Sequence, residues 1–249
     1  GLNWIYDRPL LNAHKAQNHQ MIFESIDHDL YKKAKTSFDV YPNHRLGDLD
    51  FMGEVLYLFF MYFEYEKELS LSRWRKVLYE YFREDFEYNG YIESYGKSFL
   101  EKYAQESSGK VPFKLHTDHI DKQLGGLTFI LGTYDQLKST QKIADAINYA
   151  KTITADPNIN DLSTMIFDLL QHLDQGTSKT TALQHSLEHC PTEYKESMEK
   201  ALTTIELDPF IETYSGVACG LEQSLPLIYY IINHTNSWED ALVLNATLG

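Results

Sequence analysis

Two apolar segments decide the fold of this chain: SLPLIYYIINH at residues 224–234 and SWEDALVLNATL at residues 237–248. Their apolar side chains recur at the three- and four-residue spacing of a helix and do not alternate as in a strand, so each segment predicts a helix, with Asn236 between them. The same spacing predicts further helices around residues 137–153, 160–174, 179–189 and 193–205. The sequence therefore predicts an all-α fold with no sheet of more than two strands.

The most apolar run is VLYLFFMYF at residues 55–63. It has half of the roughly 20 residues that a membrane-spanning helix needs, so it predicts a core helix that begins at Val55, and no membrane partner is expected. Aromatic residues at helical spacing are most often core residues. We therefore expect Phe59, Phe60 and Phe63 to be buried.

Composition limits the kind of protein. The 249 residues, 43% of them hydrophobic, are enough for one sizeable core and predict a single domain over residues 1–249. A formal net charge of -14 would repel a phosphate backbone, so no nucleic-acid partner is expected. The only cysteines, Cys190 and Cys219, exclude a secreted disulfide framework and predict a reducing, cytoplasmic location.

A first group of carboxylates precedes the apolar run. Asp48, Asp50 and Glu54 fall within GDLDFMGE at residues 47–54. Carboxylates gathered at a helix N-terminus can hold a hard cation such as magnesium or manganese. They can equally cap free N–H groups and complement the helix dipole without any metal.

Two further groups contain histidine. His116, Asp118 and Asp121 fall within HTDHID at residues 116–121, which suits an acid/base pair or zinc, or alternatively helix capping. The segment HSLEH at residues 185–189 matches the H-x-x-E-H signature of inverted zinc peptidases. A histidine in the last turn of a helix also favours the helix dipole and then needs no metal.

Several segments together resemble the ADP-ribosylglycohydrolase family, in its bacterial-type subgroup. The family has a proline-containing helix and an aromatic-x-x-Ala-Leu helix like those at residues 224–248, and then a Gly-Gly-Asp-x-Asp turn, of which this sequence reaches the first glycine. Smaller matches are WIYD at residues 4–7, GDLDFMGE at 47–54, GYIESYGK at 90–97 and ITADP at 153–157. The resemblance covers almost the whole chain.

This resemblance implies an orthogonal multi-helix bundle and hydrolysis of the glycosidic bond between ADP-ribose and an acceptor. The ligand would be an ADP-ribose-containing small molecule or an ADP-ribosylated protein, and two magnesium ions would assist the reaction. Glu54 would be a metal ligand and catalytic residue, and Asp48 or Asp50 would orient the catalytic water. The implied substrate-binding residues are Asp7, Glu93, His116, Asp118 and Asp121.

Other positions depart from the family pattern. Met52 and Val55 stand where the subgroup has tyrosine and glutamine, Leu127 stands where arginine is usual, and Ala155 stands where histidine is usual. Methionine and valine offer nothing to a hard cation. The alternative is therefore a catalytically degenerate family member that binds a nucleotide or protein partner, or that has a structural role. For this form we expect weak or absent magnesium binding and no detectable hydrolysis.

Overall fold

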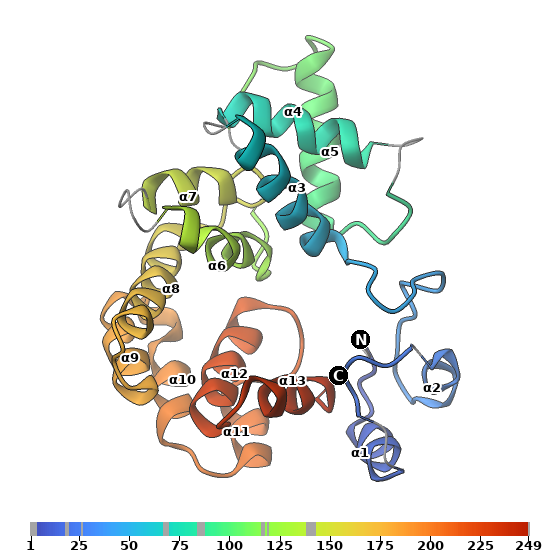
Figure 1. Ribbon diagram of the computed structural model, residues 1–249, viewed down its shortest axis with the longest axis vertical. Coiled ribbons are helices and arrows are strands. Elements are labelled where there is room, and N and C mark those ends of the chain that lie inside the picture. Colours follow the sequence, from blue (N-terminus) through green and yellow to red (C-terminus); the bar gives the residue numbers. More distant parts are fainter. Residues whose placement is uncertain are drawn as a thin grey trace. The chain divides into compact units, whose positions relative to one another are not determined.

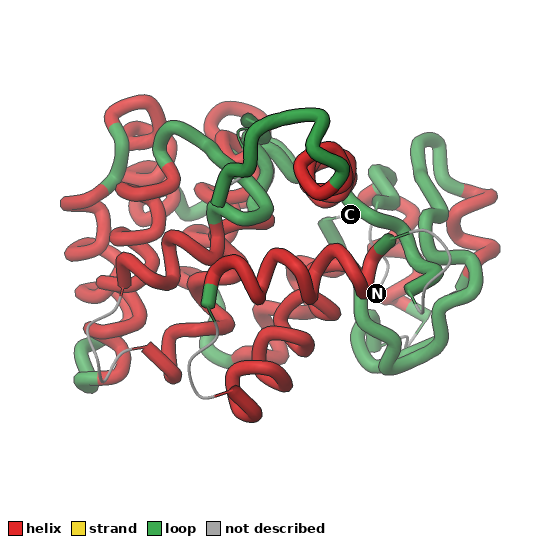
Figure 2. Tube along the Cα trace, turned by 90° about the horizontal axis from the view of Figure 1, so that it is seen from above, coloured by secondary structure: helices red, strands yellow, loops and turns green. Residues whose placement is uncertain are grey.

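The computed structural model describes residues 4–17, 20–25, 27–66, 70–83, 88–115, 118, 120–137 and 143–248. These residues are mostly helical, as Figures 1 and 2 show, and an isolated antiparallel bridge pairs Ile5 with Ser37. The helices are α1 (Arg8–Ala16), α2 (His28–Lys33), α3 (Phe51–Glu66), α4 (Leu71–Phe82), α5 (Ser94–Ser107), α6 (Gly125–Leu137), α7 (Ile143–Ala150), α8 (Ile159–Asp174), α9 (Lys179–Ser186), α10 (Thr192–Thr203), α11 (Leu207–Tyr214), α12 (Leu221–His234) and α13 (Trp238–Ala246). The prediction of an all-α fold is confirmed.

The chain divides into two compact units. Residues 1–48 and 196–249 form the first unit, and residues 49–195 form the second. The single domain that we predicted over residues 1–249 stays a prediction. Among the helices of the described ranges, none is long and apolar enough to cross a bilayer.

Phe59 of α3 is the centre of the core of the second unit. Its fully buried ring lies 5.5 Å from Trp74 of α4, 4.9 Å from Phe129 of α6 and 5.2 Å from Tyr149 of α7, measured between ring centroids. In Figure 1, α3 accordingly lies between α4 on one side and α6 on the other. A Cβ atom at Gly132 would come within 2.3 Å of Leu56, so the absence of a side chain there lets α6 approach α3 closely.

Two predictions about α3 are wrong in detail. The helix begins at Phe51, four residues before Val55, because the Asp50 carboxylate accepts a hydrogen bond of 2.7 Å from the N–H of Gly53 and so caps an earlier turn. Phe60, expected in the core, is 37% exposed. Phe59 is on the buried face, which leaves the next residue, about 100° further round the helix, facing away from it.

The first unit has a small core of its own. Ile5, Leu11, Met21 and Leu30 form a buried cluster, against which Ala246 of α13 packs. Elsewhere in this unit, the rings of Phe210 and Tyr230 stack with their centroids 4.6 Å apart and join α11 to α12. An ion pair of 2.5 Å between Arg8 and Asp208 links α1 to α11.

Candidate functional site

Three carboxylates of the second unit interact electrostatically, and we call Asp50, Glu93 and Asp121 the acidic site. Each precedes a helix: Asp50 comes directly before α3, Glu93 directly before α5, and Asp121 shortly before α6. Burial raises the pKa of Glu93 from 4.5 to about 7, the negative charges of Asp50 and Asp121 add to the rise, and Lys97 opposes it. Two segments that lie far from Glu93 in the sequence therefore place their acidic side chains within electrostatic range of it.

Asp121 is held in place from both its side chain and its backbone. The side chain is buried, with the residue 8% exposed, and its Oδ2 accepts a hydrogen bond of 2.6 Å from the Ser94 hydroxyl. Gln123 Nε2 lies 3.2 Å from the same hydroxyl oxygen and donates to it. The backbone carbonyl of Asp121 accepts a hydrogen bond of 3.2 Å from the Thr154 hydroxyl. Asp121 is thus fixed beside the first turn of α5, where Glu93 lies.

Two glycines allow the first turn of α6 to come close to these partners. A Cβ atom at Gly125 would lie 2.5 Å from the ring of Tyr95, and one at Gly126 would lie 2.2 Å from Thr154 Cγ2. Neither distance is possible for real side chains. The Gly125-Gly126 pair therefore permits the approach of α6 to α5 and to Thr154 that brings Asp121 to Ser94.

The carboxylates at the start of α3 already have protein partners. Asp50 caps the helix through Gly53, and Glu54 Oε2 accepts a hydrogen bond of 2.9 Å from the Tyr81 hydroxyl. Met52 and Val55 are buried in the core. Within the ranges that the structure describes, no group of three or more histidine, cysteine, aspartate or glutamate side chains is arranged to hold a metal ion. Mg²⁺ prefers a near-octahedral set of oxygen ligands, and Glu54 as a metal ligand stays a prediction.

Asp7 and Asp48 belong to the first unit, whereas the acidic site belongs to the second. Asp7 caps α1, with its carboxylate accepting hydrogen bonds from the N–H groups of Lys35 (3.1 Å) and Leu10 (3.2 Å), and these two bonds lower its pKa. Asp48 Oδ2 accepts a hydrogen bond of 2.8 Å from the N–H of Arg45. Both contacts are of the capping or turn type that needs no ligand.

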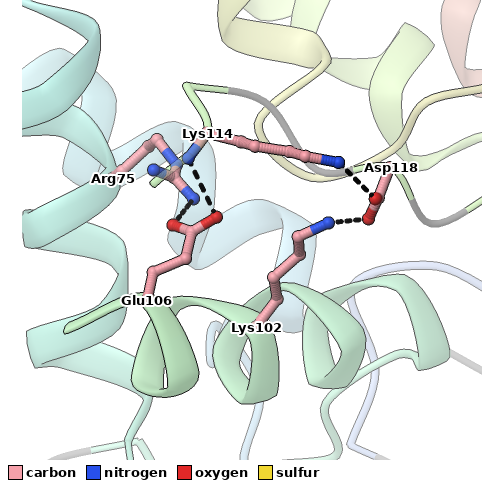
Figure 3. Close-up of polar contacts among 5 residues, drawn as sticks. All are labelled: Arg75, Lys102, Glu106, Lys114 and Asp118. Atoms are coloured by element: carbon pink, nitrogen blue, oxygen red, sulfur yellow. Dashed lines mark hydrogen bonds and ion pairs between the residues drawn. The ribbon is translucent and has the colours of Figure 1, made fainter. Parts of the chain in front are cut away.

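The two aspartates of the segment HTDHID, Asp118 and Asp121, contact different partners. His116 lies outside the described residues. Asp118 is exposed and accepts hydrogen bonds from Lys102 and Lys114, as Figure 3 shows, whereas Asp121 is buried against Ser94. Asp118 therefore pairs with two lysines and takes no part in the hydrogen bonds that fix Asp121.

The H-x-x-E-H segment ends α9 and continues as a single 3₁₀ turn, Leu187–His189. His185 Nδ1 lies 3.6 Å from Glu188 Oε1, and the His185 ring stacks on His172 with centroids 4.7 Å apart. His189 is the last residue of the turn, where a histidine favours the dipole. In this described part of the chain the motif does not gather a set of three metal ligands.

Sequence reasoning missed several residues that shape this region. Tyr81 and Ser94 are the hydroxyl partners of Glu54 and Asp121; Tyr81 lies outside the motifs, and Ser94 lies within GYIESYGK but was not itself singled out. Arg75 and Glu106 form a buried ion pair between α4 and α5. One signal was available for Arg75, which is a charged residue next to Trp74 on the apolar face of a helix.

No protein-family model matches the chain, and no curated protein matches it. The likeness to the ADP-ribosylglycohydrolase family therefore depends on the motifs of this sequence alone. The helical fold agrees with that family only at the level of an all-α architecture.

Proposed function

We propose that this chain is an ADP-ribosylglycohydrolase-like protein, with the orthogonal helical bundle of that family, whose acidic site binds the ribose of an ADP-ribose-containing molecule. Binding without hydrolysis is the function that the geometry supports best. One observation carries the proposal. The negative charges of Asp50 and Asp121 both act on Glu93 within one unit, and the family resemblance implies a role in the site for each of these three residues.

The chemistry of the site suits a polyhydroxylated ligand. Carboxylates accept hydrogen bonds from ribose hydroxyls, and such bonds to charged groups are stronger than neutral ones. With a pKa of about 7, Glu93 is about half protonated near neutral pH, so it can donate as well as accept. Binding of this kind needs no metal, whereas the reaction that the family resemblance implies would use metal ions to activate a water.

A second candidate function, hydrolysis without metal, is favoured by the same glutamate. A general acid or base works best when its pKa is near the operating pH, which a value of about 7 satisfies. In glycoside hydrolysis one carboxylic acid protonates the leaving group while a second carboxylate activates water or attacks the sugar. Glu93 would be the acid, and Asp50 or Asp121 would be the second carboxylate.

Calorimetric titration with ADP-ribose tests the binding proposal. We expect the wild-type protein to bind, and Asp121→Asn to weaken the affinity roughly tenfold to hundredfold, since a hydrogen bond to a charged group contributes about 1.5–3 kcal/mol. Glu64→Gln, which removes an exposed carboxylate from α3, is the matched control and should leave the affinity unchanged. If the wild type shows no heat of binding at millimolar ADP-ribose, the proposal is wrong.

A hydrolysis assay separates the two candidates. With ADP-ribosylated arginine or serine as substrate we expect no release of ADP-ribose above background, with or without magnesium. Turnover that needs no magnesium and is lost in Glu93→Gln would favour the metal-free hydrolase. Turnover that requires magnesium and is lost in Glu54→Gln would restore the metal mechanism of the family.

A further inference from the structure

A pocket of the second unit lies along the later turns of α5. It has a volume of about 520 Å³, within the range of small-molecule sites. Its walls come from α5 and from the segment that follows it, and they include Ser98, Lys102, Gln105, Lys114 and Asp118. None of these residues belongs to the acidic site.

Two lysines of this pocket converge on one carboxylate. Asp118 accepts a hydrogen bond from Lys102 through Oδ1 and one of 2.9 Å from Lys114 through Oδ2, and Figure 3 shows both ammonium groups directed at it. The Lys102 side chain is only 19% exposed, whereas that of Asp118 is 59% exposed. Asp118, mostly in solvent, therefore pairs with two positive charges and itself carries only one negative charge.

In the described part of the chain, Glu106, a neighbouring glutamate, does not pair with the ammonium group of Lys102 or of Lys114. Glu106 Oε2 is paired with Arg75 Nη2 at 2.7 Å, and its Oε1 accepts a hydrogen bond of 3.1 Å from the backbone N–H of Lys114. The Arg75 guanidinium is further enclosed by the rings of Tyr103 and Phe113, 5.2 and 5.1 Å away. The ion-pair partner of Glu106 is thus Arg75.

The charges left in the pocket are unfavourable to Lys102. Burial lowers the pKa of Lys102, and the positive charge of Lys114 lowers it further. The negative charge of Glu106 raises this pKa, and the positive charge of Arg75, a smaller contribution, lowers it. A dianion between the two ammonium groups would remove this repulsion, which the single negative charge of Asp118 does only in part.

We propose that Lys102 and Lys114 form a binding site for the phosphate group of a phosphorylated small molecule, and that Asp118 occupies this site in the absence of ligand. A phosphate dianion matches two ammonium groups in charge and accepts from both, and the Ser98 hydroxyl in the pocket wall is a further donor. Because the Asp118 side chain is 59% exposed, its carboxylate can return to solvent when a ligand replaces it, at a lower cost than for a buried partner. This inference goes beyond the proposed function and does not depend on it.

A second carboxylate in the pocket wall provides a matched control. Glu101 also lines the pocket, is exposed, and within the described chain makes no ion pair with either lysine. Asp118→Asn and Glu101→Gln therefore remove the same charge from the same pocket, but only the former frees the two ammonium groups. A general charge effect would act on both variants alike.

The test is calorimetric titration with pyrophosphate and with inorganic phosphate at low salt. We expect binding by the wild type, an increase in affinity of about tenfold in Asp118→Asn, and an increase of at most about twofold in Glu101→Gln, since exposed pairs contribute up to about 1 kcal/mol each. Lys102→Gln and Lys114→Gln should each weaken binding at least tenfold. Lys110→Gln, an exposed lysine outside the pocket wall, should leave it unchanged. Circular dichroism and thermal melting confirm that each variant is folded.

Two results would overturn the inference: equal affinities of Asp118→Asn and Glu101→Gln, or no binding of pyrophosphate by a folded Asp118→Asn. A further arm with ADP-ribose identifies the source of the phosphate. Competition between ADP-ribose and pyrophosphate, lost in Lys102→Gln, assigns the site to a nucleotide, and independent binding of the two assigns it to another phosphorylated molecule. Failure of the proposed function is seen separately, in the response of ADP-ribose binding to Asp121→Asn.

Discussion

Nη2 of Arg75 on α4 lies 2.7 Å from Oε2 of Glu106 on α5, and both side chains are 1% exposed. Removing two charges from water costs several kcal/mol each, and their attraction offsets this cost only while both partners are present. The pair is therefore a place where one substitution leaves a buried charge without its counter-ion. It also orders the neighbouring segment, because Glu106 accepts from the Lys114 N–H.

Glu106→Gln should lower the free energy of unfolding by about 3–5 kcal/mol, because it leaves the Arg75 guanidinium buried and uncompensated. Urea unfolding measures the change. The double variant Arg75→Met with Glu106→Leu should recover most of the loss, since apolar residues of similar size replace the pair. A double variant as unstable as Glu106→Gln would show that lost packing, and not the unpaired charge, is the cause.

Phe59→Ala and Phe60→Ala should differ sharply although the residues are adjacent. Phe59 is fully buried among the rings of three other helices, so its truncation should cost about 3–5 kcal/mol. Phe60 is 37% exposed, and we expect a cost below about 1 kcal/mol. Chemical denaturation of both variants checks the assignment of the helix face, and equal costs would contradict it.

The raised pKa of Glu93 predicts a specific pH dependence of stability. Between pH 4.5 and about 7 the folded state keeps a proton that the unfolded state releases, so this group contributes less stability as the pH rises through that window. Glu93→Gln removes this loss and should raise the melting temperature relative to wild type by several degrees at pH 8, with little difference at pH 4. Glu64→Gln controls for the loss of one negative charge. The same difference at both pH values would show that the carboxyl of Glu93 does not titrate in this window.

Magnesium should not stabilise the protein measurably. The carboxylates at the start of α3 are used by Gly53 and Tyr81, and Met52 and Val55 are in the core. Any ligand that binds only the folded state raises its stability, so thermal melting with and without millimolar magnesium reports a site directly. A stoichiometric micromolar site that disappears in Glu54→Gln would contradict this expectation.

Helix positions were predictable where apolar residues recur every three or four positions among polar ones. The predicted helices at residues 160–174 and 193–205 correspond to α8 (Ile159–Asp174) and α10 (Thr192–Thr203) within a few residues. The run at residues 55–63 is apolar throughout, so its spacing does not indicate a face. Trp74, Phe129 and Tyr149, which bury Phe59, come from other helices, and the sequence does not reveal that they meet there.

The candidate site was predictable as residues but not as an arrangement. Motifs singled out Asp50, Glu93 and Asp121, whereas their mutual approach depends on tertiary packing, including the close contact at Gly126. Asp118 is three positions from Asp121 and shared its motif, yet it pairs with Lys102 of α5. Long-range pairing of this kind leaves no local pattern.

The order of the two units along the chain has a consequence for synthesis on the ribosome. The first unit combines residues 1–48 with residues 196–249, and Ala246 packs against the cluster around Ile5 and Leu11. The intervening residues 49–195 take roughly 7–30 s to translate at about 5–20 residues per second. The second unit is therefore complete and can fold while the N-terminal cluster still awaits its partner. Nascent chains stalled before residue 196 should expose that cluster to chaperones, and release of the chaperones should follow emergence of α13.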